Sequence, residues 1–179
     1  MGGEGSRSEH VLVAGAGADG GDVDVGSASN VLAVTYRTPA EDWLGRFQAG
    51  PERVAVVSVG EQSRAATASS PGGGTDVLAS TTGVVETVAD AGDVAAVGAL
   101  VCDYLAAWEG AGSTDVVVDD ASAVLDAVSA ETAFRFLHAL LSRAASMDAR
   151  VVAGFDASRY PPHVVQTFAP LFDDVREGA

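Results

Sequence analysis

The sequence predicts an α/β domain, a three-layer α/β/α sandwich with a mainly parallel sheet. Short apolar segments that suit strands alternate with amphipathic helical segments along most of the chain. The strand segments are apolar at nearly every position, which is typical of strands covered on both faces. The 179 residues are 47% hydrophobic and 20% charged, which is enough for one globular domain of ordinary size. Right-handed crossovers would then place helices on both sides of the sheet.

The expected strands are runs rich in Val and Ala, bounded by glycine, proline or polar residues. Such runs of five to seven residues are too short for typical helices. Two Gly- and Asp-rich or Gly- and Ser-rich segments, 15–29 and 66–76, are expected to be loops. The expected strands are 10–16, 30–36, 53–59, 83–89, 115–119, 150–155 and 171–175.

Capping residues indicate where the expected helices begin. Thr38, with Pro39 next to it and Glu41 three residues on, is typical of a capping box. Asp93 and Ser129 each precede a segment with apolar residues at spacings of three and four. The expected helices are 39–47, 94–108, 130–147 and 161–168.

The expected domain organisation is a disordered tail over 1–9 and one domain over 10–176. The tail is polar and Gly-rich and has no apolar core, so no secretory signal is expected. The longest apolar run, 94–102, is far shorter than a bilayer span. The single cysteine, Cys102, has no partner for an intramolecular disulfide. We therefore expect a cytoplasmic protein.

The charge balance excludes some partners and indicates an environment. Ten basic residues against 25 acidic ones give a net charge of −15, which opposes binding to nucleic acid or anionic membranes. All the basic residues are Arg, there is no Lys or Ile, and Asp outnumbers Glu by 16 to 9. Molar salt screens the self-repulsion of such a chain. The composition therefore favours a halophilic cytoplasm.

Gly15, Gly17 and Gly20 are weak candidates for cofactor binding. They match G-x-G-x-x-G by letter, directly after the first expected strand. However, a P-loop needs a lysine, and no helix is expected after these glycines to direct its positive end at a phosphate. The other interpretation is a solvated connecting loop.

Asp119 is the second weak candidate, for cofactor or metal binding. It follows the apolar run 116–118, where an acid could hold Mg²⁺ in the manner of a Walker B residue. Alternatively, Asp119 binds neighbouring loop backbone and Asp120 is solvated. The histidines are too widely spaced for a zinc site, and no catalytic residue is expected.

The chain resembles a RecA/KaiC-type ATPase core, and more particularly a haloarchaeal family of RecA/KaiC-like domains of unknown function. The segments that carry the resemblance are VVSVGEQSRAA (56–66), AGDVAAVGALVCDYLAAWE (91–109), DVVVDDASAVL (115–125), FRFLHALLSRAASMDARVVAGFD (134–156) and QTFAPLFD (166–173). The resemblance implies a RecA-like fold. The Walker A residues of those ATPases are missing at 14–22, and the carboxylates that KaiC-like enzymes carry after the second strand have no counterpart at Tyr36 and Arg37. Only Asp119 carries over.

The expected function is therefore that of a pseudo-ATPase, a regulatory or protein-interaction module without a cofactor. It would bind a protein partner or a second copy of itself, but neither nucleic acid nor membrane. The alternative is an atypical ATP-binding or ATP-hydrolysing protein that uses ATP and Mg²⁺. Aromatic residues are enriched at interfaces. The expected interaction residues are Trp43, Phe47, Trp108 and Tyr160.

Overall fold

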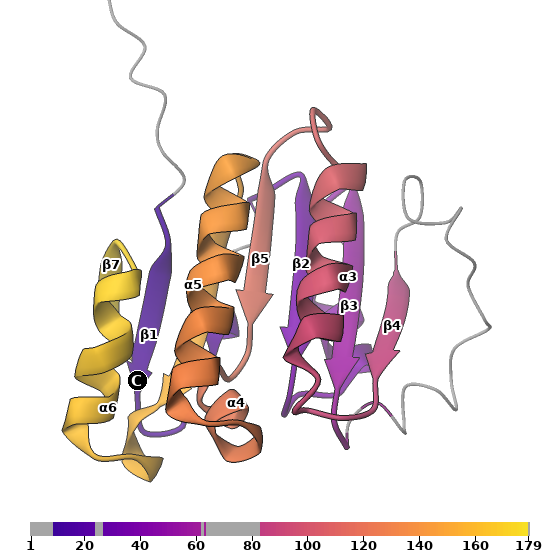
Figure 1. Cartoon of the computed structure of the whole chain (residues 1–179). Helices are drawn as coiled ribbons and strands as arrows, with labels where there is room; N and C mark the ends of the chain where they lie inside the picture. The colour runs from indigo at the N-terminus through magenta and orange to yellow at the C-terminus, as the bar shows by residue number, and fades with distance from the viewer. Residues whose placement is uncertain (1–8, 24–26, 62, 64–82, 179) are drawn as a thin grey trace, which may run out of the picture.

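The described part of the chain forms one seven-stranded sheet in which every strand pairing is parallel. The computed structural model describes residues 9–23, 27–61, 63 and 83–178. The strands follow the order β4-β3-β2-β5-β6-β1-β7 across the sheet (Figure 1). The predicted α/β class with a mainly parallel sheet is thereby confirmed. The strands are β1 Val11–Gly15, β2 Asn30–Thr35, β3 Arg53–Val59, β4 Val84–Val88, β5 Thr114–Val118, β6 Arg150–Asp156 and β7 Asp174–Glu177.

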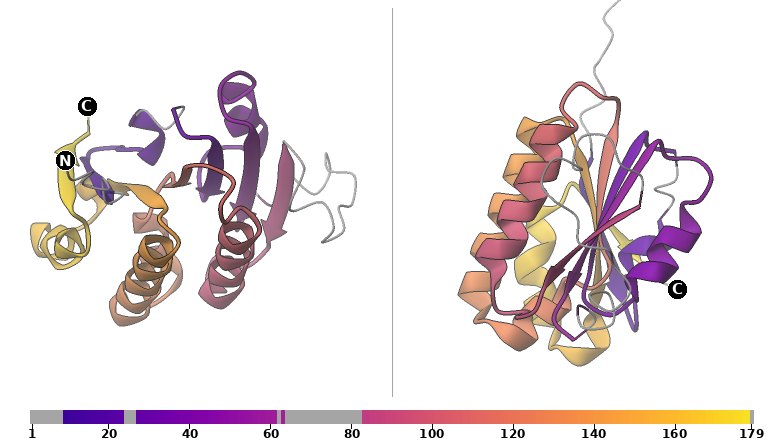
Figure 2. Two further views of the ribbon diagram at one scale, coloured as in Figure 1. Left: turned by 90° about the horizontal axis from the view of Figure 1, so that it is seen from above. Right: turned by 90° about the vertical axis from the view of Figure 1, so that its right-hand side faces the viewer.

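Helices on both faces of the sheet give three layers (Figure 2). One face is covered by α3, α4, α5 and α6, and the other face carries α1 together with the short 3-10 turn η1. None of the described helices has both the length and the apolar character needed to cross a membrane. The helices are α1 Ala40–Arg46, α3 Val94–Ala107, α4 Ser122–Ala127, α5 Ala130–Ser146 and α6 Pro162–Phe168, and the 3-10 turns are η1 Gly20–Asp22, η3 Ala157–Arg159 and η4 Ala169–Leu171.

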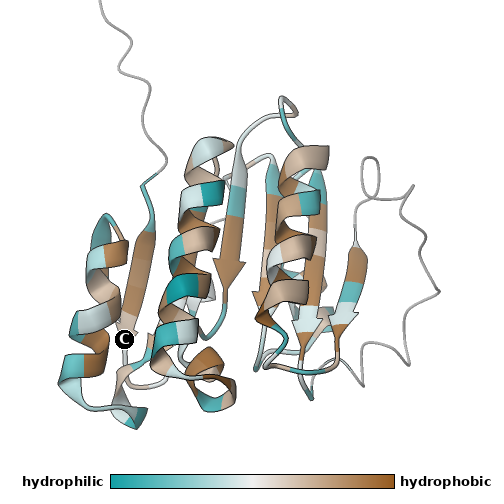
Figure 3. Ribbon diagram, viewed as in Figure 1, coloured by the Kyte–Doolittle hydropathy of each residue, from teal (hydrophilic) through white to brown (hydrophobic). Residues whose placement is uncertain are grey.

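The strand side chains alternate between two cores, so apolar colour covers most of the central strands (Figure 3). The larger core lies under α3, α5 and α6. In the smaller core, the indole of Trp43 is fully buried over strand residues such as Val31 and Val56. Its ring stacks on Phe47 with 6.0 Å between centroids. Because α1 is the only α-helix described on this face, Trp43 in the helix and Phe47 directly after it supply much of the cover.

Two helix caps agree with the sequence prediction, and one does not. Asp93 accepts a hydrogen bond from the amide of Ala96, and Ser129 accepts one from the amide of Thr132. The predicted capping box at Thr38 is wrong, because Pro39 is the N-cap of α1 and no side chain caps it. The amide of Thr38 donates to Asp119 instead.

Several boundaries also differ from those predicted. The short helix α4 was not expected, because no capping signal stands before Ser122. The last strand begins at Asp174 rather than at 171, since 169–171 form a 3-10 turn. Residues 1–8 of the predicted tail over 1–9 lie outside the described residues, and so does the predicted loop over 66–76.

His10 is a buried residue, 6% exposed, that joins β1 to its neighbours. Its Nδ1 accepts a hydrogen bond from the amide of Val151 at 3.0 Å, and its Nε2 lies 3.1 Å from the carbonyl oxygen of Leu141. This pattern requires the neutral ring protonated on Nε2, because an imidazolium has no acceptor nitrogen for Val151. Burial lowers the pKa of His10 below 6.5, although the charge of Asp173 acts in the opposite direction.

We expect the protein to lose stability as pH falls below about 6.5, because the unfolded chain then binds a proton that the folded chain excludes. The measurement is urea unfolding between neutral pH and about pH 5, above the range in which the aspartates titrate. The His10→Gln variant should show a flatter dependence than the wild type. The control is His163→Gln at an exposed position. If His10→Gln and His163→Gln change with pH alike, His10 does not cause the loss.

Candidate functional site

The neighbouring strands β2 and β5 form a switch point in the topology of the sheet. From β2 the chain passes through α1 to β3, whereas from β5 it passes through α4 and α5 on the opposite face to β6. The two connections leave in opposite directions, which opens a crevice at the carboxyl ends of the two strands. In parallel sheets ligands bind in such crevices. The residues that follow these strand ends, 36–39 and 119–121, are therefore the first place to look for a site.

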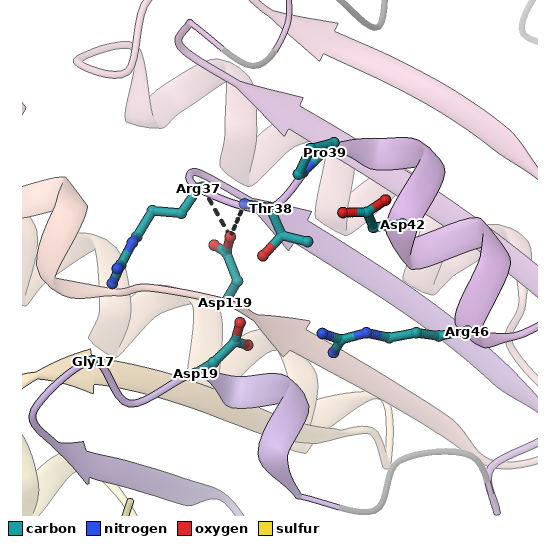
Figure 4. A pocket seen from close by; sticks show the side chains of 8 residues that line it. All are labelled: Gly17, Asp19, Arg37, Thr38, Pro39, Asp42, Arg46 and Asp119. Atoms are coloured by element: carbon teal, nitrogen blue, oxygen red, sulfur yellow. Dashed lines mark hydrogen bonds between the residues drawn. The ribbon is translucent and has the colours of Figure 1, made fainter.

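The carboxylate of Asp119 lies at the base of this crevice and is bound by the chain itself. The residue is 1% exposed, and its oxygens accept hydrogen bonds from three consecutive amides, those of Tyr36, Arg37 and Thr38, at 2.8–2.9 Å. The Thr35 hydroxyl and the amide of Asp120 donate to it as well. Figure 4 shows the carboxylate beneath the loop that follows β2. Successive amides that converge in this way form an anion site, and here the anion belongs to the protein.

Asp120 and Asp156 form ion pairs with Arg37 at the carboxyl ends of β2, β5 and β6. Asp120 is fully buried and accepts hydrogen bonds from the amide and hydroxyl of Ser122, so the expectation that it is solvated is wrong. The Arg37 guanidinium lies 3.3 Å from Asp120 and 3.9 Å from Asp156, and thus bridges the ends of β2, β5 and β6. Arg159 lies 3.7 Å from Asp120. Because Arg159 also pairs with Asp126, these side chains form a network of ion pairs across the strand ends.

Asp156 also holds the loop that follows β1. Its carboxylate accepts hydrogen bonds from the amide of Gly17 at 3.1 Å and from the amide and hydroxyl of Ser158. The Ser158 hydroxyl and the Gly17 amide are the main groups that lower the pKa of Asp156, and the charge of Arg37 acts in the same direction. The carboxylate is therefore ionised and engaged within the fold at neutral pH.

The loop over 15–21 is packed onto the sheet at Ala18 and Gly20, which are buried, whereas 16 and 17 are exposed to solvent. The amide of Gly20 donates to the carbonyl of Asp119 at 3.1 Å, and the amide of Ala18 donates to the carbonyl of Gly15 at 3.3 Å. The amide of Gly21 donates to the side chain of Asp19 at 2.7 Å. Together with Gly17, these amides leave few donors for a phosphate.

The glycines that match a nucleotide-binding pattern serve close packing here. A Cβ on Gly20 would lie 2.3 Å from the carbonyl oxygen of Val118, and one on Gly15 would lie 2.9 Å from the carbonyl oxygen of Gly178. Gly154 in β6 faces the same contact, since its Cβ would lie 2.5 Å from the amide nitrogen of Gly20. Gly17 has a φ of 68°, which glycine adopts most readily. The glycines at 15 and 20 thus allow the backbone of the loop to approach neighbouring backbone closely.

An open cavity of about 390 Å³ remains on the α1 side of this edge (Figure 4). A second cavity, of about 570 Å³, lies on the α4 side and includes Tyr36 and Arg37 in its wall. The hydroxyl of Tyr36 is buried without a hydrogen-bond partner. Burial raises the pKa of this hydroxyl above its usual range, so it stays protonated. The first cavity is lined by Gly17, Asp19, Arg37, Thr38, Pro39, Asp42, Arg46 and Asp119.

The structure removes most of the predicted interaction surface. Trp43, Phe47 and Trp108 are between 0% and 8% exposed and belong to the two cores, so they are not available on the surface of this fold. Tyr160 is half-buried; its hydroxyl donates to Asp126 and lies 3.2 Å from the carbonyl oxygen of Ser122. Burial, and after it the hydrogen bond to Asp126, raise the pKa of Tyr160 to about 12. Its described contacts are structural.

Sequence reasoning identified Asp119 but missed its partners in this network. Asp156 could have been found by the same rule, because it follows the apolar run of β6 as Asp119 follows that of β5. Arg37 was noted only as standing where KaiC-like enzymes carry a carboxylate. Among the described residues, no group of three or more His, Cys, Asp or Glu side chains is placed to hold a metal ion.

Comparisons with known proteins place the chain in a family without assigning it a function. Neither the curated proteins nor the solved structures gave a match. Residues 9–177, which include the whole described sheet, match the model of a family described as a family of unknown function (DUF7504). The chain belongs to this family, DUF7504.

Proposed function

We propose that the protein is a non-catalytic relative of RecA/KaiC-like ATPases, a regulatory or protein-interaction module of a halophilic archaeon. The observation that carries the proposal is the packing of the 15–21 loop on the carboxyl ends of β5 and β6. Gly20 lies against Val118 and Gly154 there, and the amides of Gly17 and Gly20 donate to Asp156 and Asp119 of the same chain. Asp119, the one residue that matched a Walker B acid, is engaged by five donors of its own chain.

The composition supports the same proposal. Phosphoryl transfer depends on cationic groups that stabilise the charge of the transferred phosphate. The chain has no lysine, and Arg37 at this edge is paired with Asp120 and Asp156. The net charge of −15 and the excess of aspartate favour a salt-rich cytoplasm. The alternative is an atypical protein that binds or hydrolyses ATP with Mg²⁺ in the cavity beside Asp119.

A single sample in molar KCl tests both parts of the proposal. We expect no rise in melting temperature with Mg-ATP, whereas a ligand at a hundredfold its Kd would stabilise the fold by about 2.7 kcal/mol. On the same sample, light scattering should give the mass of a dimer, or a pull-down should capture a partner. Stabilisation by Mg-ATP would favour the alternative. A strict monomer with empty pull-downs would contradict the interaction role.

A further inference from the structure

Two opposite charges on α1 lie one helical turn apart in the sequence and do not pair with each other. Asp42 and Arg46 are four residues apart on the helix, a spacing at which an acid and a base commonly form an ion pair. Both side chains are exposed and line the cavity of about 390 Å³. Neither forms an ion pair with any residue that the structure describes. Figure 4 shows the Arg46 side chain extended into the cavity, apart from Asp42.

Arg46 is held away from Asp42 by two contacts. Its guanidinium lies over the ring of Trp43, 4.7 Å from the centroid, in a cation–π contact. On the other side it packs against Gly21, where an added Cβ would lie 2.3 Å from the Arg46 Nη1. An arginine side chain fixed in this way loses little further conformational entropy when it binds an anion. Its position is therefore suited to recognition.

The other charges of the cavity are already engaged. The Asp119 carboxylate accepts five hydrogen bonds, and Arg37 pairs with Asp120 and Asp156. Asp19 accepts a hydrogen bond from the amide of Gly21. A dianion such as phosphate would meet Arg46 but would be repelled by the carboxylates of Asp19 and Asp42. A ligand that carries one negative and one positive group can place the first on Arg46 and the second near Asp42, so both contacts are attractive.

We propose that this cavity binds a small zwitterion, with its anionic group on Arg46 and its cationic group facing Asp42. The cavity lies at the switch point of the sheet, where parallel α/β folds bind ligands, and its volume suits a small molecule. This binding role goes beyond the proposed interaction function and does not depend on it. It would give a non-catalytic domain a ligand to sense.

The experiment is a titration of the ¹⁵N-labelled full chain, monitored by NMR, with glycine, β-alanine and 4-aminobutyrate, whose charges lie at increasing separations. Acetate and methylammonium supply each charge alone, and inorganic phosphate supplies a dianion. We expect at least one zwitterion to give saturable shifts of the Gly17, Gly21 and Thr38 amides. Its affinity should exceed those of acetate, methylammonium and phosphate by about tenfold or more.

Matched variants show whether the shifts report the proposed contacts. Arg46→Gln should abolish saturation, and Gly21→Ala should weaken binding because its Cβ would lie 2.3 Å from Arg46 Nη1 and 2.8 Å from the Trp43 ring, and so disturbs both partners of the cation–π contact. Arg135→Gln, at an exposed arginine of α5, should bind as the wild type does. The proposal is overturned if no zwitterion saturates, if acetate or phosphate binds equally well, or if Arg46→Gln leaves binding unchanged.

Discussion

Replacement of Asp119 by Ala is expected to cost about 3–5 kcal/mol of unfolding free energy, among the largest losses for a single substitution. The change removes the acceptor of three loop amides, of the Asp120 amide and of the Thr35 hydroxyl. Donors that stay buried without a partner lose the hydrogen bonds that water would otherwise provide. The β2–α1 loop, which carries Arg37, should detach from β5. Urea unfolding at fixed KCl concentration measures the loss.

The control for Asp119→Ala is the replacement of an exposed aspartate by alanine. Asp103→Ala on α3 removes the same charge from an exposed residue and should change stability by no more than about 0.5 kcal/mol. Formate added to Asp119→Ala should restore part of the stability, because a small carboxylate can occupy the vacated anion site. Equal losses in the two alanine variants would show that Asp119 is not the anchor of this edge.

Replacement of Gly154 by Ala is expected to cost about 3 kcal/mol, at the upper end of the usual range for overpacking. The added Cβ would lie 2.2 Å from the carbonyl oxygen of Asp119 and 2.5 Å from the amide nitrogen of Gly20, and both are backbone atoms. The 15–21 loop must then lift away and lose the hydrogen bond between Gly20 and Asp119. Urea unfolding gives the cost, and faster hydrogen exchange at the Gly20 amide locates it.

A second glycine provides the control for this substitution. A Cβ on Gly98 in α3 would meet only Phe136, at an ordinary contact distance of 3.8 Å. Gly98→Ala should therefore stabilise the protein by about 0.5–1 kcal/mol through helix propensity. If Gly154→Ala were as stable as the wild type, the loop would not be packed as described, and room for a ligand would exist beneath it.

The sequence was sufficient to predict the elements that depend on local patterns. Strands apolar on both faces and separated by helices predicted the parallel sheet, because only a sheet covered on both sides buries such strands. Asp93 and Ser129 predicted two helix starts, since an N-cap bond joins residues that are close in sequence. The position of Asp119 at a strand end also followed from the pattern.

The sequence was not sufficient where distant segments decide the role of a residue. Asp119 and the amides of 36–38 are more than 80 residues apart, so no local pattern reveals their contact. The same holds for Gly20 and Gly154. Each must lack a side chain because the loop packs directly on β6, and the sequence does not show this contact. Thr38 is a residue type that often caps helices, but here its amide donates a hydrogen bond to Asp119. The sequence also does not show that Trp43 and Phe47 are buried, because the strands that they cover are distant in the sequence.

A crystal structure of the protein grown in molar KCl and soaked with Mg-ATP tests the central claim most directly. The claim is that backbone and carboxylates of the chain itself occupy the edge where a nucleotide would bind. We predict no density for a triphosphate over the 15–21 loop, with the Gly17 and Gly20 amides still bonded to Asp156 and Asp119. A triphosphate bound over that loop, with those two hydrogen bonds broken, would contradict it.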